Sequence, residues 1–182
     1  GQTYFAVQTR RQEIADADAL AELTEDQRRL LLRQRIKLQN TDLASAAKTA
    51  GVITALDFAV FQNHGYRGLY NGLTADAIHR RKRLKKSQHI LDHMGATELA
   101  ANLFRSTQAE EKLRRDQVQG KDAANEVHYQ AGVVVRRAIA ELGGTMPEDL
   151  PSADSIKKLE RAEKKRLAAP KSKGKKNDES LP

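Results

Sequence analysis

A run of basic residues near the middle of the chain is the strongest chemical signal in this sequence. Six of the eight residues from His79 to Lys86 are lysine or arginine, and no acid lies between Asp76 and Asp92. Ion pairs along their own helix cannot neutralise these cations, so an anionic partner would relieve their mutual repulsion. A phosphate backbone is such a partner, although a solvated helix face is the ordinary alternative. We predict a nucleic-acid-binding surface at Arg67, Arg80, Arg81, Lys82, Arg83, Lys85 and Lys86.

A second basic stretch lies near the C-terminus. Ten bases and two acids fall between Lys157 and Lys176. A cationic arm of this kind increases DNA affinity without sequence specificity. The alternative is that this stretch is a solubilising tail. The candidate residues here are Lys157, Lys158, Lys164, Lys165 and Arg166.

The histidines beside the first run have the spacing of metal ligands but lack the rest of a metal site. His89 and His93 are four residues apart, so both rings could point the same way on a helix. A zinc site needs a third ligand and usually a fourth, and "HILDH" departs from H-E-x-x-H by carrying Ile at the Glu position. The neighbouring positive charge also opposes a dication. We predict no metal site and no cofactor.

Familiar enzyme motifs are absent. The sequence contains no G-x-S-x-G, no G-x-x-x-x-G-K-[ST] and no G-x-G-x-x-G after a strand. The glycines of "GYRGLYNG" are interpreted as turn formers. Tyr66 and Tyr70 in this segment either stack on unpaired bases, with Arg105 as a further flanking cation, or pack over the turn. We predict no catalytic residues and a non-enzymatic protein.

Composition narrows the class of protein. The 182 residues are 39% hydrophobic, 31% charged and only 4% aromatic, which suits helices packed through small interfaces. No cysteine is present, so there is no disulfide framework. No apolar run approaches the roughly 18 residues of a membrane span, and no secretory signal is visible, so we expect a cytoplasmic protein without membrane contact. The net charge of the chain is +8, and residues 61–119 contribute +5 of it through eleven bases and six acids. Such a localised excess of positive charge favours an anionic partner.

Capping residues and glycines divide the chain into helices. Thr24 and Gln27 form a capping box, and Gly51 has the place of a C-terminal stop. In the last long helix an apolar stripe is expected to be buried, formed by Ala124, Val127, Ala131, Val134, Ala138 and Leu142. The expected helices are 2–23, 24–50, 55–64, 75–84, 88–94, 97–119, 122–142 and 153–169.

The stretch 74–95 also has the outline of a helix-turn-helix. Two short capped helices would meet through apolar positions, although Arg83 stands in the turn where glycine is usual. Such a unit would cross a phosphate backbone with bases where these lie. The predicted fold is therefore an all-α, multi-helix bundle with two long N-terminal helices, this helix pair and a disordered basic C-terminal tail.

Several long blocks of the sequence resemble one bacterial family. The blocks "GQTYFAVQTRRQE", "LTEDQRRLLLR", "AGVITALDFAVFQNHGYRGLYNGLTADAIH", "LKKSQHILDHMGATELAANLFRSTQAEEKLR" and "ELGGTMPEDLP" are similar to the DNA-damage-inducible protein D (DinD) family from about residue 1 to 166. One departure is "KRLK", Lys82–Lys85, where the family resemblance leads us to expect "KGLK". The resemblance implies a BRO-type domain ahead of this region, so we expect a C-terminal fragment that opens where that domain would end.

The resemblance also implies a function. Members of the family are induced in the SOS response and are associated with inhibiting the recombinase RecA on single-stranded DNA; no catalytic residues come with the family. We therefore expect a protein that binds DNA, single-stranded more than sequence-specific duplex, and modulates RecA-mediated recombination. Two alternatives stay open: an interaction module that dimerises or binds a protein through its long helices, and a helix-turn-helix regulator. The expected division is a linker helix 1–23, a helical domain 24–144, a basic helix 145–169 and a disordered tail 170–182.

Overall fold

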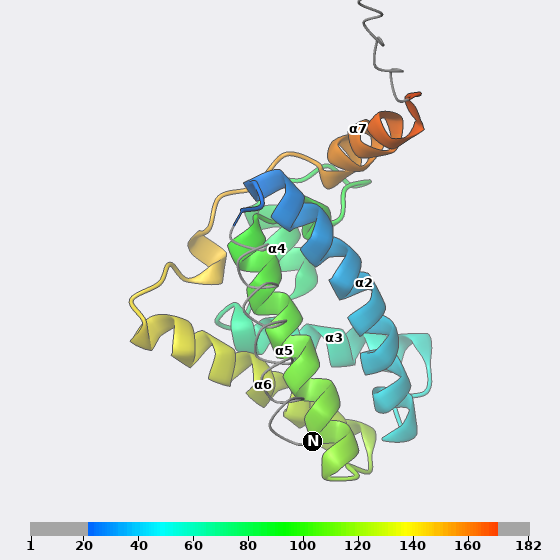
Figure 1. The fold of residues 1–182 in the computed structure, drawn as a ribbon. Helices are drawn as coiled ribbons and strands as arrows, with labels where there is room; N and C mark the ends of the chain where they lie inside the picture. Colours follow the sequence, from blue (N-terminus) through cyan, green and yellow to red (C-terminus); the bar gives the residue numbers. More distant parts are fainter. Residues whose placement is uncertain (1–21, 171–182) are drawn as a thin grey trace, which may run out of the picture.

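The computed structural model describes residues 22–170, and this part of the chain is entirely helical (Figure 1). Its elements are α2 (Glu25–Thr49), α3 (Ala55–Leu69), α4 (Ala75–Arg81), the 3-10 helix η1 (Ile90–His93), α5 (Ala96–Arg115), α6 (Lys121–Glu141), the 3-10 helix η2 (Pro147–Asp149) and α7 (Ile156–Ala168). The all-α prediction is confirmed. Residues 2–21 of the expected helix 2–23 and residues 171–182 of the expected tail lie outside the described residues, while residues 22 and 23 are not helical.

Thr24 begins a helix as predicted, and two further threonines, Thr54 and Thr74, do the same. The Thr24 side chain accepts from the Gln27 backbone amide, and the Gln27 side chain accepts from the Thr24 amide, which completes the capping box of α2. Thr54 forms the same reciprocal pair at α3, and the Thr74 hydroxyl accepts from an amide in the first turn of α4. These caps satisfy backbone donors that a helix start leaves without partners.

Two pairs of parallel helices build the body of the molecule (Figure 1). α2 and α5 run side by side, and contacts from Glu25 to Ala96 and from Gln39 to Glu110 fix their register. α3 and α6 run across the lower half of that pair in Figure 1. One buried apolar cluster joins Leu43, Phe61 and Leu113, and a second joins Ile36, Leu69, Tyr70, Met94 and Leu99. The second cluster lies beneath α4 and η1, because Ile78 belongs to it.

The interpretation of the "GYRGLYNG" glycines as turn formers is right for Gly72, which lies in a turn with φ of 89°, and wrong for the other two. Gly65 and Gly68 lie inside α3, which continues to Leu69, and they face Gly132 of α6. A Cβ on Gly68 would overlap the carbonyl oxygen of Tyr129. The glycines therefore allow the two backbones to approach more closely than side chains would permit.

The expected helix-turn-helix is also wrong. α4 is a seven-residue α-helix, but the stretch predicted as the second helix contains only the four-residue η1, whose N-cap residue His89 makes no side-chain cap bond. Ser87 therefore does not begin a helix. The cause is tertiary: Asp92 and His93 are buried against α2 and the segment before α7, which holds this stretch in a compact turn.

A connecting segment, residues 145–155 and called the strap below, returns from the end of α6 to α7. Its Ala153 amide donates to the His93 carbonyl, and its Asp154 carbonyl accepts from the buried Arg29 of α2. α7 begins only at Ile156, because Ser152 donates to the Lys82 carbonyl and does not cap a helix. Within residues 22–170 no helix is both long and apolar enough to cross a bilayer.

The helix crossing yields a stability prediction. In Gly132→Ala the new Cβ would lie 2.7 Å from the Gly65 carbonyl oxygen and 2.7 Å from the Leu69 amide nitrogen, both rigid backbone atoms. We expect the free energy of unfolding to fall by about 2–3 kcal/mol, measured by urea denaturation. Gly95→Ala is the control, because its Cβ would meet only the flexible end of Glu25 at 3.4 Å. Equal losses in both variants would contradict a close crossing at Gly132.

Candidate nucleic-acid interface

The predicted basic surface consists of the last two residues of α4 and the ordered turn that follows them. We call residues 80–86 the basic turn. The His79 Nε2 lies 3.0 Å from the carbonyl oxygens of both Lys85 and Gln88, so an N–H at this position donates to both. The Gln88 side chain in turn accepts from the Lys85 amide at 2.7 Å. Arg83 has φ of 55°, in the left-handed region that a glycine would occupy without strain.

Two of the six cations in the basic turn are already neutralised by acids from elsewhere in the chain. The Arg81 guanidinium donates to the Glu148 carbonyl at 2.6 Å and to the Asp149 carboxylate at 2.9 Å, both in the strap. The Lys82 ammonium is almost fully buried and donates to the Glu98 carboxylate of α5 at 2.8 Å. These contacts give Arg81 and Lys82 structural roles, and they lower the number of cations available to a polyanion.

The other four cations of the turn are different. Each of them is exposed, and within residues 22–170 none has a carboxylate partner. They are Arg80, Arg83, Lys85 and Lys86, and they are called the free cations below. Arg67 is likewise exposed and without an ion-pair partner in that part of the chain, but it lies on α3 and no described contact links it to the turn.

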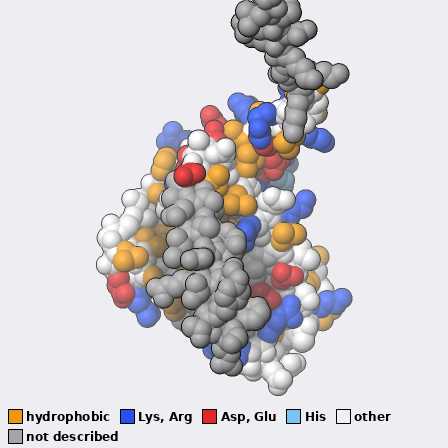
Figure 2. Space-filling model, in the orientation of Figure 1, with side chains coloured by type: hydrophobic (Ala, Val, Ile, Leu, Met, Phe, Trp, Pro, Cys, Tyr) orange, Lys and Arg blue, Asp and Glu red, His pale blue; other side chains and the backbone are white. Residues whose placement is uncertain are grey.

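α7 adds the second predicted cluster to the same end of the molecule. The Lys157 ammonium lies 4.0 Å from the Asp92 carboxylate of η1, and α7 also contacts α2 (Figure 1). Figure 2 shows lysine and arginine side chains gathered at this end. Lys158, Lys164 and Lys165 are exposed, whereas Arg166 pairs with Glu163 of its own helix at 2.6 Å. The fold thus brings together two basic stretches that are far apart in the sequence.

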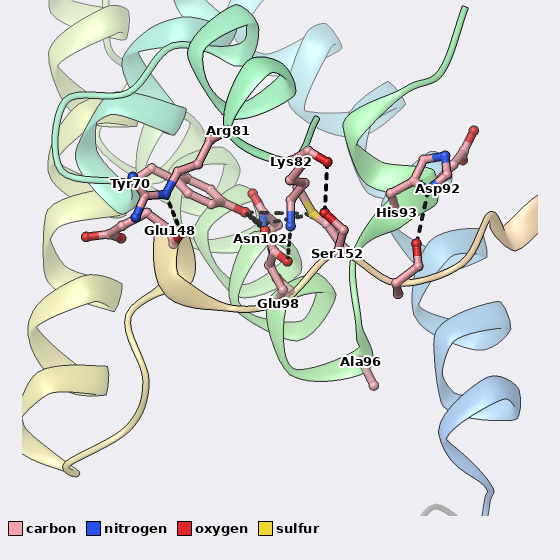
Figure 3. A network of polar contacts seen from close by, with 12 residues as sticks. Tyr70, Arg81, Lys82, Asp92, His93, Ala96, Glu98, Asn102, Glu148 and Ser152 are labelled. Atoms are coloured by element: carbon pink, nitrogen blue, oxygen red, sulfur yellow. Dashed lines mark hydrogen bonds and ion pairs between the residues drawn. The ribbon is translucent and has the colours of Figure 1, made fainter. Parts of the chain in front are cut away.

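Beneath the turn, a buried polar network continues from Lys82 into the core (Figure 3). Glu98 accepts from Lys82 and, through its other oxygen, from the Tyr70 hydroxyl at 2.8 Å. The Asn102 amide donates to the Tyr70 oxygen at 2.8 Å and to the Glu98 carbonyl at 3.0 Å. Burial raises the pKa of the Glu98 carboxyl, and the Lys82 ammonium opposes this rise. The ion pair is therefore held by a full set of hydrogen bonds, as a buried pair requires.

The network ends at a buried arginine and a buried histidine. Arg105 donates to the Asn102 side-chain oxygen Oδ1 at 3.2 Å and to His128 Nε2, and its guanidinium lies 4.9 Å from the Tyr66 ring centre. His128 Nδ1 lies 2.9 Å from the Phe61 carbonyl oxygen, so the neutral ring carries its hydrogen on Nδ1. Burial, and next the Arg105 charge, place the pKa of His128 well below its ordinary value.

This network corrects the interpretation of Arg105 and decides between the two alternatives for Tyr66 and Tyr70. Arg105 is buried and cannot flank a DNA surface. Tyr66 and Tyr70 are also buried and contact each other edge to face with ring centres 6.1 Å apart, so they pack in the core and do not stack on bases.

The histidine pair near the turn does not form a metal centre. His93 is buried and its Nδ1 lies 3.0 Å from the Ala153 carbonyl oxygen, whereas His89 is exposed. Among residues 22–170 no group of three or more His, Asp or Glu side chains is placed to hold a metal ion.

Glu98, Asn102 and His128 were not among the predicted site residues. Lys82, the partner of Glu98, was predicted to bind DNA. A signal was available, because Glu98 and Asn102 occupy the same face of α5 as the buried Ala109 and Leu113. Polar residues on an otherwise apolar face indicate buried partners, but the sequence does not identify those partners.

The fold and the basic turn define an all-helical protein with an exposed cationic end. Residues 23–159 match the family described as the DinD C-terminal domain, and the chain belongs to this family. It is 62% identical over 165 residues to DNA damage-inducible protein D of Escherichia coli (strain K12), which covers 90% of this chain and 60% of that relative. The chain thus spans about 60% of the length of that curated relative. No solved structure matches the chain with comparable significance.

The left-handed backbone conformation of Arg83 leads to a prediction about the free energy of unfolding. The left-handed conformation costs an L-residue about 1–2 kcal/mol, and glycine loses about 0.5–1 kcal/mol through its larger unfolded-state entropy. We expect Arg83→Gly to raise the free energy of unfolding by about 0.5 kcal/mol, measured by urea denaturation. Lys86→Gly, in the same turn but without positive φ, should lower it. A loss in both variants would show that Arg83 is not strained.

The buried His128 predicts acid sensitivity. Because its folded-state pKa is lowered, the unfolded chain binds a proton below about pH 6.5 that the folded chain does not. The His128 contribution to stability is therefore complete above that pH and falls by up to about 1.4 kcal/mol per unit as the pH decreases. We expect the His128 ring signals in NMR spectra to remain those of a neutral ring with Nδ1–H at pH 5.5. A titration midpoint near 6.5 would contradict the burial and the Arg105 contact.

Proposed function

We propose that this chain is a non-enzymatic DNA-damage-response module that binds single-stranded DNA through the basic turn and α7. Through this binding it would modulate recombination by the RecA filament, as the family resemblance implies. The observation that carries the proposal is the set of four exposed free cations without carboxylate partners in residues 22–170.

Charge placement supports a polyanion as the partner. Four cations lie within seven consecutive residues, and the bonds of His79 and Gln88 hold their backbone in one conformation. Cations fixed close together repel one another, and binding phosphates would relieve this repulsion while releasing counterions from the DNA. A surface ordered before binding also loses less side-chain and backbone freedom when the ligand arrives.

The shape of the turn favours a single strand over sequence-specific duplex. Major-groove recognition commonly uses an α-helix that enters the groove, and the stretch after α4 offers only the short η1, with Asp92 and His93 buried. The free cations can contact phosphates without entering a groove. The lysines on α7 at the same end of the molecule would extend the contact along the strand.

An interaction module remains the second candidate because the surface also has an apolar groove. Phe104 of α5 and Val134 of α6 are 51% and 54% exposed, and they line a groove of about 260 Å³ between the two helices. Exposed large apolar side chains that lie together are typical of protein contacts. A homodimer or a recombinase contact at this groove would need no DNA.

The salt dependence of DNA binding tests the proposal. We expect the triple variant Arg83→Ala, Lys85→Ala, Lys86→Ala to bind an oligothymidylate more weakly, with a log–log salt slope smaller in magnitude by about 2, because three phosphate contacts are lost. The measurement is fluorescence anisotropy between about 50 and 200 mM salt.

A charge-matched control separates location from net charge. Arg35→Ala, Lys48→Ala, Arg137→Ala removes the same charge from exposed residues that have no ion-pair partner within residues 22–170. This control should keep the wild-type slope. Equal slopes in all three proteins, or no binding by the wild type, would favour the interaction module.

A further inference from the structure

A pocket of about 340 Å³ lies between α4 and the strap, and two residues of the basic turn, Arg81 and Lys82, line it. Its lining is about equally apolar and polar, and the polar part includes Arg81, Asp149 and Ser152, some of which is visible in Figure 3. The apolar wall residues are Leu73, Ile78, Pro147, Leu150 and Pro151. This volume is at the small end of the range for ligand pockets.

The strap that closes the pocket is firmly anchored. Arg136 of α6 donates to both carboxylate oxygens of Glu148 at 2.7 Å, and Arg81 donates to the Glu148 carbonyl oxygen at 2.6 Å. On the other side, the Ser152 hydroxyl donates to the Lys82 carbonyl at 3.2 Å. Bidentate arginine–carboxylate pairs fix orientation as well as distance. The pocket is therefore formed before any ligand arrives.

The chemistry of the pocket favours a neutral, planar ligand. Its two cations are engaged, Arg81 by the strap and Lys82 by Glu98, so no unpaired positive charge is left inside for a phosphate. Leucine, isoleucine and proline residues supply apolar contact, while Asp149 and Ser152 add polar groups to the lining. A nucleobase has this combination of apolar faces and polar edges.

We propose that this pocket takes up one unstacked base of a single strand whose phosphates lie on Arg80 and Arg83. These two residues are the chain neighbours of Arg81 and Lys82, which line the pocket, so a strand held by the free cations would lie within a few residues of it. The inference rests on the proposed function and adds that the protein recognises a base of the strand as well as its phosphates. Burial of one base gives a preference for strands that carry bases over the bare phosphate backbone.

The test compares two strands with equal charge. One is an eight-nucleotide backbone with abasic sites throughout, and the other carries a single central 2-aminopurine on the same backbone. We expect the base to tighten binding about tenfold, as stacking a single base does elsewhere, with the same salt slope for both strands. The 2-aminopurine fluorescence should change on binding.

A matched pair of variants locates the effect. Ser152→Phe places a ring at the pocket rim and should abolish the tenfold preference without altering the salt slope. Ser87→Phe makes the same change on an exposed residue of the neighbouring turn that does not line the pocket, and it should retain the preference. If both strands bind equally to the wild type with a normal slope, the pocket proposal is wrong and the proposed function stands. If neither strand binds, both are wrong.

Discussion

The ion pair between Lys82 and Glu98 is the interaction on which the arrangement of this surface depends. Both side chains are almost completely buried, so separating them would leave an uncompensated charge in the core. The pair ties the end of α4 to the first turn of α5, and the Tyr70 hydroxyl adds the end of α3 to the same point. The backbone of the basic turn is thus fixed from beneath, while its remaining cations are exposed and have no carboxylate partner among the described residues.

The strap has a related effect on the other side of the turn. It brings Glu148 and Asp149 to Arg136 and Arg81, and so removes one more cation from the surface that the sequence suggested. Cations without neighbouring acids in the sequence can still acquire acidic partners from distant segments, as Arg81 and Lys82 do. The four cations without such a partner in residues 22–170 are exposed. The polyanion hypothesis therefore depends on a smaller and better defined set of residues than the sequence indicated.

Local signals were sufficient for the helices but not for their contacts. Capping hydroxyls act on amides three residues away, so Thr24, Thr54 and Thr74 could be identified from the sequence alone. The buried face of α6 could not be identified from the sequence alone. It is set by the glycines that bring α3 close to α6, and it is centred on His128 and Gly132. In the predicted stripe Val134 is half exposed and Leu142 is 87% exposed. Likewise, only the tertiary partners of Asp92 and His93 explain why η1 replaces a helix.

The central claim is that the free cations of the basic turn contact the DNA, and lysine labelling tests it most directly. Acetylation of individual lysines, followed by mass spectrometry with and without a short oligothymidylate, reports which ammonium groups become covered. The account predicts that Lys85, Lys86 and Lys158 react more slowly when the strand is bound. Lys48, at the opposite end of α2 from α7, should react at an unchanged rate (Figure 1). Bound DNA that leaves Lys85 and Lys86 fully reactive would contradict the account.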